Sequence, residues 1–212
     1  MNTDLHHTMI VYQGKDVALP LEEYPQILND APLQDSRYIH LREITFQEKG
    51  QKKRWEIIKS HNSVSILLYD RQKDGFIFVR QFRISVFLKN PKHGYMYELC
   101  AGLCDKDKSL ETIVIEEIEE ECGYHVTSDR LIKIQQFYSN VGMNGAYQNL
   151  FYAEVTQDDK KSKGGGNEAE QEHIELVFVP RNLIHEFLDD TNCPKTISLA
   201  YSILWWQQHY KS

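Results

Sequence analysis

Residues 100–126 read CAGLCDKDKSLETIVIEEIEEECGYHV, and five of the six residues from Glu116 to Glu121 are glutamates. Ser109 can accept a hydrogen bond from the free amides of a first helical turn, and Gly123 suits the left-handed position that follows a last turn. The stretch therefore predicts a helix over residues 110–122 that carries a crowd of carboxylates near its C-terminal end.

One face of this predicted helix is half apolar and half acidic. A helical wheel at roughly 100° per residue places six residues on that face: Leu110, Ile113, Val114, Glu117, Glu120 and Glu121. The carboxylates repel one another, lie at the negative end of the helix dipole and lose hydration if they are buried. A divalent cation would offset these costs, and an oxygen-only ligand set favours Mg²⁺ or Mn²⁺ over zinc. The alternative is an ordinary solvated face, because glutamate favours helix.

The whole chain has 212 residues and a formal net charge of −7. This length allows one large domain, or one domain with a small appendage. Excess negative charge disfavours nucleic-acid binding, but a few placed cations can hold a small phosphorylated molecule. No apolar run reaches the roughly 18 residues of a membrane helix, and the N-terminus lacks the pattern of a secretory signal. We therefore expect a cytoplasmic protein that binds neither nucleic acid nor membranes.

The hydrophobic pattern predicts mostly strands. Strands at 38–46 and 55–58 are expected to form a small N-terminal β subdomain over residues 1–60. Within 61–212, strands are predicted at 63–70, 76–83, 95–102, 131–138, 147–155 and 173–180. Helices are predicted near 181–189 and 195–210, with Pro194 in the first turn of the last. The expected fold class is α/β, or α+β, in a layered sandwich.

The glutamate stretch resembles the Nudix box, G-x5-E-x7-R-E-U-x-E-E-x-G-U, where U is apolar. Laid on Gly102 without a gap, the box meets the chain in register at Glu117, Ile118, Glu120, Glu121, Gly123 and Tyr124. Two positions depart, since Lys108 replaces the first glutamate of the box and Glu116 replaces its arginine. Because that arginine usually orients a neighbouring carboxylate, its loss concerns the support of the metal ligands and not the ligands themselves.

Further stretches, among them FVRQFR, YELCAGL and FYSNVGMNG, resemble the nucleoside-diphosphate-sugar pyrophosphatases of the Nudix superfamily, nearest to the UDP-sugar diphosphatases. The resemblance covers roughly residues 38–210. It implies a Nudix α-β-α sandwich with an N-terminal β subdomain, an intertwined homodimer, and Mg²⁺-dependent hydrolysis of a small-molecule nucleotide sugar. The sister ADP-ribose pyrophosphatases usually carry a proline where this chain has Ser139, whose hydroxyl and amide we expect to bind a hexose. ADP-ribose hydrolysis and a non-catalytic nucleotide sensor stay as alternatives.

By resemblance, Glu117 and Glu121 are the main metal ligands, the Ala101 carbonyl is a third, and Glu120 supports or shares a metal. Glu98 matches a glutamate that reaches metal or substrate, or else it forms an edge-strand salt bridge. Arg83 can grip phosphate oxygens with its planar fork. Arg80 is a second candidate for that role, or a surface strand residue. Trp55 and Tyr38 match positions that stack on the base, or they belong to the subdomain core.

A general base is still needed, and in this group it comes from an acidic loop. Here that loop spans 167–175 and carries Glu168, Glu170, Glu172 and Glu175. We expect Glu172 or Glu170 to be the base. Gly164, Gly165 and Gly166 would then hinge a lid that closes over the substrate. The alternative is an ordinary solvated loop.

Overall fold

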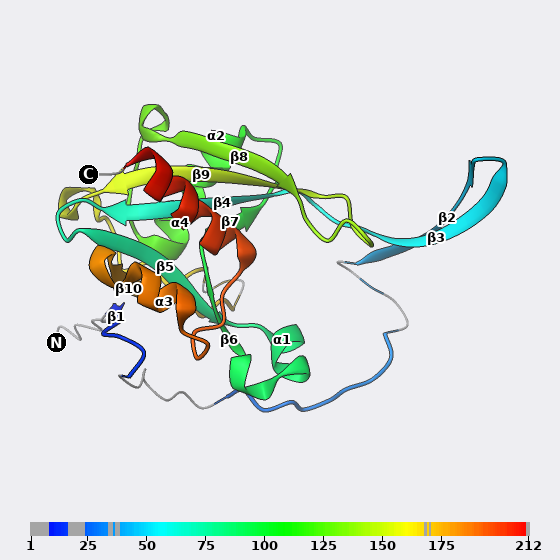
Figure 1. Ribbon diagram of the computed structural model, residues 1–212, viewed down its shortest axis with the longest axis horizontal. Coiled ribbons are helices and arrows are strands. Elements are labelled where there is room, and N and C mark those ends of the chain that lie inside the picture. The colour runs from blue at the N-terminus through cyan, green and yellow to red at the C-terminus, as the bar shows by residue number, and fades with distance from the viewer. Residues whose placement is uncertain are drawn as a thin grey trace.

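The computed structural model describes residues 9–16, 24–33, 36, 39–167, 169 and 171–210. Its centre is a mixed sheet with the strand order β1-β10-β5-β4-β9-β8, in which β6 pairs with β5 and β7 pairs with β4 (Figure 1). The strands are β1 (Ile10–Val11), β4 (Ser63–Asp70), β5 (Gly75–Phe82), β6 (Tyr95–Glu98), β7 (Cys100–Leu103), β8 (Ile132–Tyr138), β9 (Tyr147–Val155) and β10 (Glu175–Pro180).

Helices cover both faces of the sheet, because side chains along a strand alternate between its faces. On β5, Ile77 and Val79 pack in the core beneath α2 (Leu110–Glu117), whereas Phe76 and Phe78 pack in the core beneath α3 (Ile184–Asp189) and α4 (Ile197–His209). A short helix α1 (Ile84–Lys89) follows β5. The predicted α/β sandwich with three layers is therefore confirmed (Figure 1).

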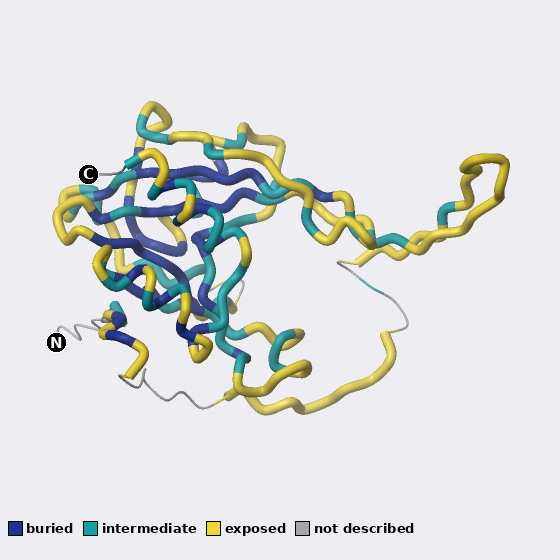
Figure 2. Tube along the Cα trace, in the orientation of Figure 1, coloured by how far each residue is buried: buried dark blue, intermediate teal, exposed yellow. Residues whose placement is uncertain are grey.

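Two further strands lie apart from this body. Strands β2 (His40–Glu48) and β3 (Gln51–Lys59) pair with each other and, in the described part of the chain, with no other strand. They form a long ribbon that projects from the sandwich and is exposed along most of its length (Figures 1 and 2). The earlier strand β1 instead pairs in parallel with β10, so residues 1–60 contribute both to the large sheet and to the ribbon.

The glutamate stretch begins and ends where the sequence predicts. The Ser109 side chain accepts a hydrogen bond from the Thr112 amide at 3.1 Å, and Gly123 closes the helix with a φ of 71°. The predicted α-helix over 110–122 is wrong in its second half, however. The α-helical part ends at Glu117, and a π-helical turn, η2 (Ile118–Cys122), follows it.

Two other predicted elements differ from the structure, and the sheet explains both. The strand predicted at 95–102 is split at Leu99, because β6 pairs with β5 while β7 pairs with β4. Pro194 lies outside the last helix, because its carbonyl accepts the Tyr97 amide at 2.8 Å and keeps this segment extended beside β6. Helix α4 begins after Thr196. No helix in the described residues has the length and apolar character needed to cross a bilayer.

Candidate active site

A pocket of about 440 Å³ lies where β5 and β6 diverge from β4 and β7. Its lining holds six carboxylates and two cationic side chains, so negative charge is in excess. The lining residues are Ser63, Ser65, Gln81, Arg83, Glu98, Ala101, Gly102, Leu103, Asp105, Lys106, Glu117, Glu120, Glu121, Gln148 and Glu172. The three glutamates predicted to share a helix face thus meet the candidate loop base Glu172 in one pocket.

Glu121 is the most deeply buried of these carboxylates. Its side chain is 4% exposed, and one of its oxygens accepts the backbone amide of Ala101 at 2.9 Å. Burial raises the pKa of Glu121 to about 8, because the ionised form loses more hydration than this hydrogen bond returns. The bond also holds the glutamate helix against β7, where the predicted Ala101 ligand lies.

Glu117 packs directly on the first glycine of the box. A Cβ atom at Gly102 would lie 2.0 Å from a carboxylate oxygen of Glu117, so a larger residue would displace the carboxylate. Burial, and then the nearby charge of Glu120, raise the pKa of Glu117 to about 7. Gly102 is therefore required by a close approach of side chain to backbone.

The donor set fits a divalent cation by its chemistry. The described residues contain no preformed cluster of three or more His, Cys, Asp or Glu side chains around one point. Even so, Glu117, Glu120 and Glu121 line the same pocket, where six carboxylates face only two cationic side chains. A hard cation with oxygen ligands would compensate this excess of negative charge.

Arg83 and Glu98 form a two-pronged ion pair across the start of α1. The Arg83 Nε and Nη2 atoms each donate to a Glu98 oxygen at 2.8 Å, and this pairing raises the pKa of Arg83. Both side chains line the pocket. The salt bridge that was the alternative for Glu98 is therefore present, and it fixes the direction in which the guanidinium faces the pocket.

Arg80 lies on the other face of β5. It is 7% exposed, contacts a Glu175 oxygen at 3.1 Å and lies over the ring of Tyr95, 4.9 Å from its centre. The interpretation of Arg80 as a surface residue is thus wrong, and Arg80 does not line the acidic pocket. Since alternate residues of a strand share a face, Gln81 faces the pocket instead.

The acidic residues of the loop 167–175 lie in different surroundings. Glu172 lines the pocket, and one of its oxygens accepts the Asn167 amide at 3.1 Å. Glu175 begins β10 and contacts Arg80. Glu168 and Glu170 lie outside the described residues.

Trp55 and Ser139, which were expected to bind the base and the sugar, do not line this pocket within one chain. Trp55 is 55% exposed on the ribbon, and its indole nitrogen donates to the Gly142 carbonyl at 2.8 Å, so its assignment to a subdomain core is wrong. Ser139 donates both its amide and its hydroxyl to the Ala146 carbonyl, at 3.0 and 3.4 Å. The amide predicted to bind a hexose therefore closes its own loop. Tyr38 lies outside the described residues.

The two departures from the box meet each other. The Lys108 ammonium forms an ion pair with the Glu116 carboxylate on the outer side of α2 and lowers the pKa of Glu116. The box has an anion at the first of these positions and a cation at the second, whereas this chain has the cation Lys108 first and the anion Glu116 second. Each of the two residues therefore has a partner of opposite charge.

Several pocket residues were not identified from the sequence. Ser63 and Ser65 alternate with apolar residues on buried β4, and Gln148 donates to the Ser65 hydroxyl at 3.0 Å. Polar residues two apart in an apolar strand were a usable signal, because they share one face. Lys106 had no such signal, since it lies in the loop between β7 and α2.

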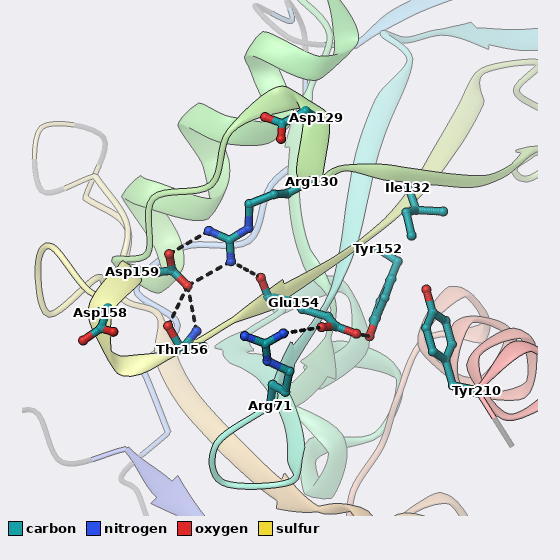
Figure 3. A pocket seen from close by; sticks show the side chains of 10 residues that line it. All are labelled: Arg71, Asp129, Arg130, Ile132, Tyr152, Glu154, Thr156, Asp158, Asp159 and Tyr210. Atoms are coloured by element: carbon teal, nitrogen blue, oxygen red, sulfur yellow. Dashed lines mark hydrogen bonds and ion pairs between the residues drawn. The ribbon is translucent and has the colours of Figure 1, made fainter. Parts of the chain in front are cut away.

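A larger hollow of about 560 Å³ lies elsewhere, near the ends of β9 and α4 (Figure 3). Several of its charged side chains form ion pairs with one another. Arg130 contacts the two oxygens of Asp159 at 2.7 and 2.9 Å, and Arg71 lies 3.9 Å from Glu154. Because these pairs already balance much of the charge, the smaller acidic pocket is the better candidate for chemistry.

Comparison with known proteins decides the family. The NUDIX domain family matches residues 59–197, which include every residue of the acidic pocket. The chain belongs to the Nudix family. It is a Nudix hydrolase, as the box predicts, and Nudix hydrolases generally use divalent metal ions.

The relatives of this Nudix chain include members of two named groups. It is 33% identical to the uridine diphosphate glucose pyrophosphatase NUDT14 of Bos taurus, over 80% of this chain and 88% of that protein. It is 32% identical to a GDP-mannose pyrophosphatase of Citrobacter koseri, over 73% of this chain and 80% of that protein. The crystal structure of an ADP compounds hydrolase superposes with a TM-score of 0.64 at 16% identity, covering 90% of this chain and 98% of the other. At that identity the likeness concerns the fold alone.

Proposed function

We propose that this Nudix hydrolase cleaves the diphosphate of a nucleoside-diphosphate sugar, converting UDP-glucose or a close relative into UMP and a sugar 1-phosphate with Mg²⁺. The observation that carries the proposal is the pocket that brings Glu117, Glu120, Glu121 and Glu172 together. Two relatives are named as pyrophosphatases of UDP-glucose and of GDP-mannose, and these names support a nucleoside-diphosphate sugar as the substrate class.

Different residues of the pocket would bind the metal ion and the diphosphate. Glu117, Glu120 and Glu121, with the Ala101 carbonyl, would hold Mg²⁺, for which Mn²⁺ is a substitute. When bound, the ion supplies neutralisation of charge on the diphosphate oxygens. Arg83, oriented by Glu98, contacts the diphosphate from the other side of the pocket. The neutral side chains of Ser63, Ser65, Gln81 and Gln148 complete the lining.

In the reaction, the oxygen of a water molecule bonds to one phosphorus, and the bond from that phosphorus to the bridging oxygen breaks. The proton released by the water passes to the Glu172 carboxylate, which acts as general base. The bridging oxygen leaves with the second phosphate, so one phosphate ester remains on each product. Glu172 suits this role because its carboxylate lies in the same pocket as the proposed metal ligands.

We also propose that the active form is a homodimer, in which residues 1–60 serve dimerisation and base binding and 61–212 form the catalytic domain. An isolated two-stranded ribbon is marginal in water, yet β2 and β3 expose Leu41, Phe46 and Trp55. Trp55 does not line the acidic pocket of its own chain. A partner chain across a two-fold axis would cover the ribbon and receive Trp55 near its site. A cytoplasmic location is part of the same proposal.

Side-by-side kcat/KM values for UDP-glucose, GDP-mannose and ADP-ribose with Mg²⁺ test the substrate. We expect UDP-glucose to be preferred over ADP-ribose. A preference for ADP-ribose by about tenfold or more would place the chain with the ADP-ribose pyrophosphatases. Binding of these nucleotides without release of a nucleoside monophosphate would instead favour the sensor.

A further inference from the structure

The C-terminal end of the glutamate helix is closed by residues from another part of the chain. We call Gly164, Gly165 and Gly166 the glycine strap. The Gly165 amide donates to the Glu121 carbonyl at 2.8 Å, and the Gly166 amide donates to the Glu120 carbonyl at 3.2 Å. The strap therefore binds the backbone of two proposed metal-binding residues.

The residues just before the strap close the rest of the same helix end. The Lys160 ammonium donates to the Cys122 carbonyl at 2.7 Å, and the Lys161 amide donates to the Gly123 carbonyl at 2.8 Å. The last carbonyls of a helix otherwise lack partners and carry the negative end of its dipole. These donors thus offset part of the cost of placing carboxylates at that end.

Only glycine fits the strap. The φ angles of Gly164, Gly165 and Gly166 are 69°, 109° and 87°, a region that other residues rarely adopt. A Cβ atom on Gly164 would lie 2.4 Å from the Glu121 carbonyl oxygen. The strap can approach the helix this closely because it has no side chains.

The other side of the strap carries the proposed general base. A Cβ atom on Gly166 would lie 2.8 Å from the Cβ of Glu172. The Asn167 amide donates to a Glu172 oxygen at 3.1 Å, and the Ile174 amide donates to the Gly165 carbonyl at 3.1 Å. One segment of three residues therefore contacts the metal-binding helix on one side and the loop base on the other.

We propose that the glycine strap is a positioning device that sets Glu172 relative to Glu120 and Glu121, and that it is not the hinge predicted from its composition. Its glycines are positioning residues, because they act through Glu172. This inference rests on the proposed role of Glu172 as the general base.

Hydrogen exchange of the metal-free wild-type protein tests the docking without turnover. The Gly165 and Gly166 amides should exchange slowly, because both are bound to the helix end. Gly164→Ala should raise exchange in 164–166 and also in the segments that contain Glu121 and Glu172. Fast exchange of the strap amides in the wild type would overturn the proposal.

Kinetics then test positioning. Gly164→Ala should lower kcat by about tenfold or more while KM changes little, because a displaced general base affects proton transfer more than binding. In a Glu172→Gln background, the same change should cost clearly less than in the wild type, since the group it positions has already been removed and only its effect on the Glu121 side of the strap remains. Normal turnover of Gly164→Ala, or losses that multiply in the double variant, would contradict the proposal.

Gly50→Ala is the control for backbone strain. Gly50 also has a positive φ, 78°, but a Cβ atom there meets nothing within 4 Å. The fall in unfolding temperature of Gly50→Ala measures strain alone, and a larger fall for Gly164→Ala measures lost docking. If the wild type cleaves no nucleoside-diphosphate sugar, the proposed function fails, while hydrogen exchange still decides whether the strap is docked.

Discussion

Lys108 and Glu116 occupy two box positions with the opposite charges from those of the motif, and they form an ion pair with each other. Each residue taken alone looked like the loss of a supporting group. The contact shows that the two residues compensate each other's charge next to Glu117, the first glutamate of the proposed metal site. The departures therefore do not favour a sensor over an enzyme.

An exchange of charges tests this pair. Lys108→Glu should lower both the unfolding temperature and kcat, because two carboxylates then repel each other at the start of the glutamate run. The double variant Lys108→Glu, Glu116→Arg should recover both quantities. Thermal unfolding and steady-state kinetics measure the recovery. A double variant as impaired as the single one would show that the pair does not support the site.

Between elements, the ion pair of Arg130 with Asp159 joins the short helices η3 (Ser128–Arg130) and η4 (Gln157–Asp159), as Figure 3 shows. The Arg130 guanidinium holds the pKa of Asp159 well below its usual range. A carboxyl whose pKa is depressed in the folded state stabilises the fold above its unfolded pKa. That contribution is lost as the pH falls through the folded-state pKa.

Asp159→Asn should therefore be less stable than the wild type at neutral pH, and the difference should shrink as the pH falls below about 4. Chemical denaturation at a series of pH values measures it. Asp158→Asn is the matched control, since Asp158 lies on the same turn and its side chain forms no ion pair within the described residues. A stability difference that does not change with pH would contradict this account of Asp159.

Elements were predictable from the sequence where local pattern decides them. Strands β4, β5, β8 and β9 follow from short apolar runs bounded by turns, and the glutamate helix follows from its capping residues. The split of the strand predicted at 95–102 was not predictable, because it depends on the pairing of β6 with β5 and of β7 with β4. The docking of the glycine strap depends likewise on residues about 45 positions apart in the chain. The Arg83–Glu98 pair and the inward face of Gln81 also require the register of the sheet.

At the scale of the whole molecule, the exposed ribbon of β2 and β3 is the surface that we propose a partner chain covers. We expect light scattering to give a mass twice that of one chain at micromolar concentration. Leu41→Lys, which places a charge on the exposed ribbon, should shift the population toward monomer and lower activity with it. Full activity in a monomer would remove the proposal that Trp55 serves the site of a second chain.

The most direct test of the central claim is the Mg²⁺-dependent release of UMP from UDP-glucose by the wild type and by Glu121→Gln. The wild type should release UMP and glucose 1-phosphate in equal amounts, and only when Mg²⁺ is present. Glu121→Gln should lose turnover by orders of magnitude and bind Mg²⁺ more weakly, while its metal-free fold is retained because one buried, repelling charge is gone. Wild-type activity in Glu121→Gln, or binding of UDP-glucose without any cleavage by the wild type, would contradict the account.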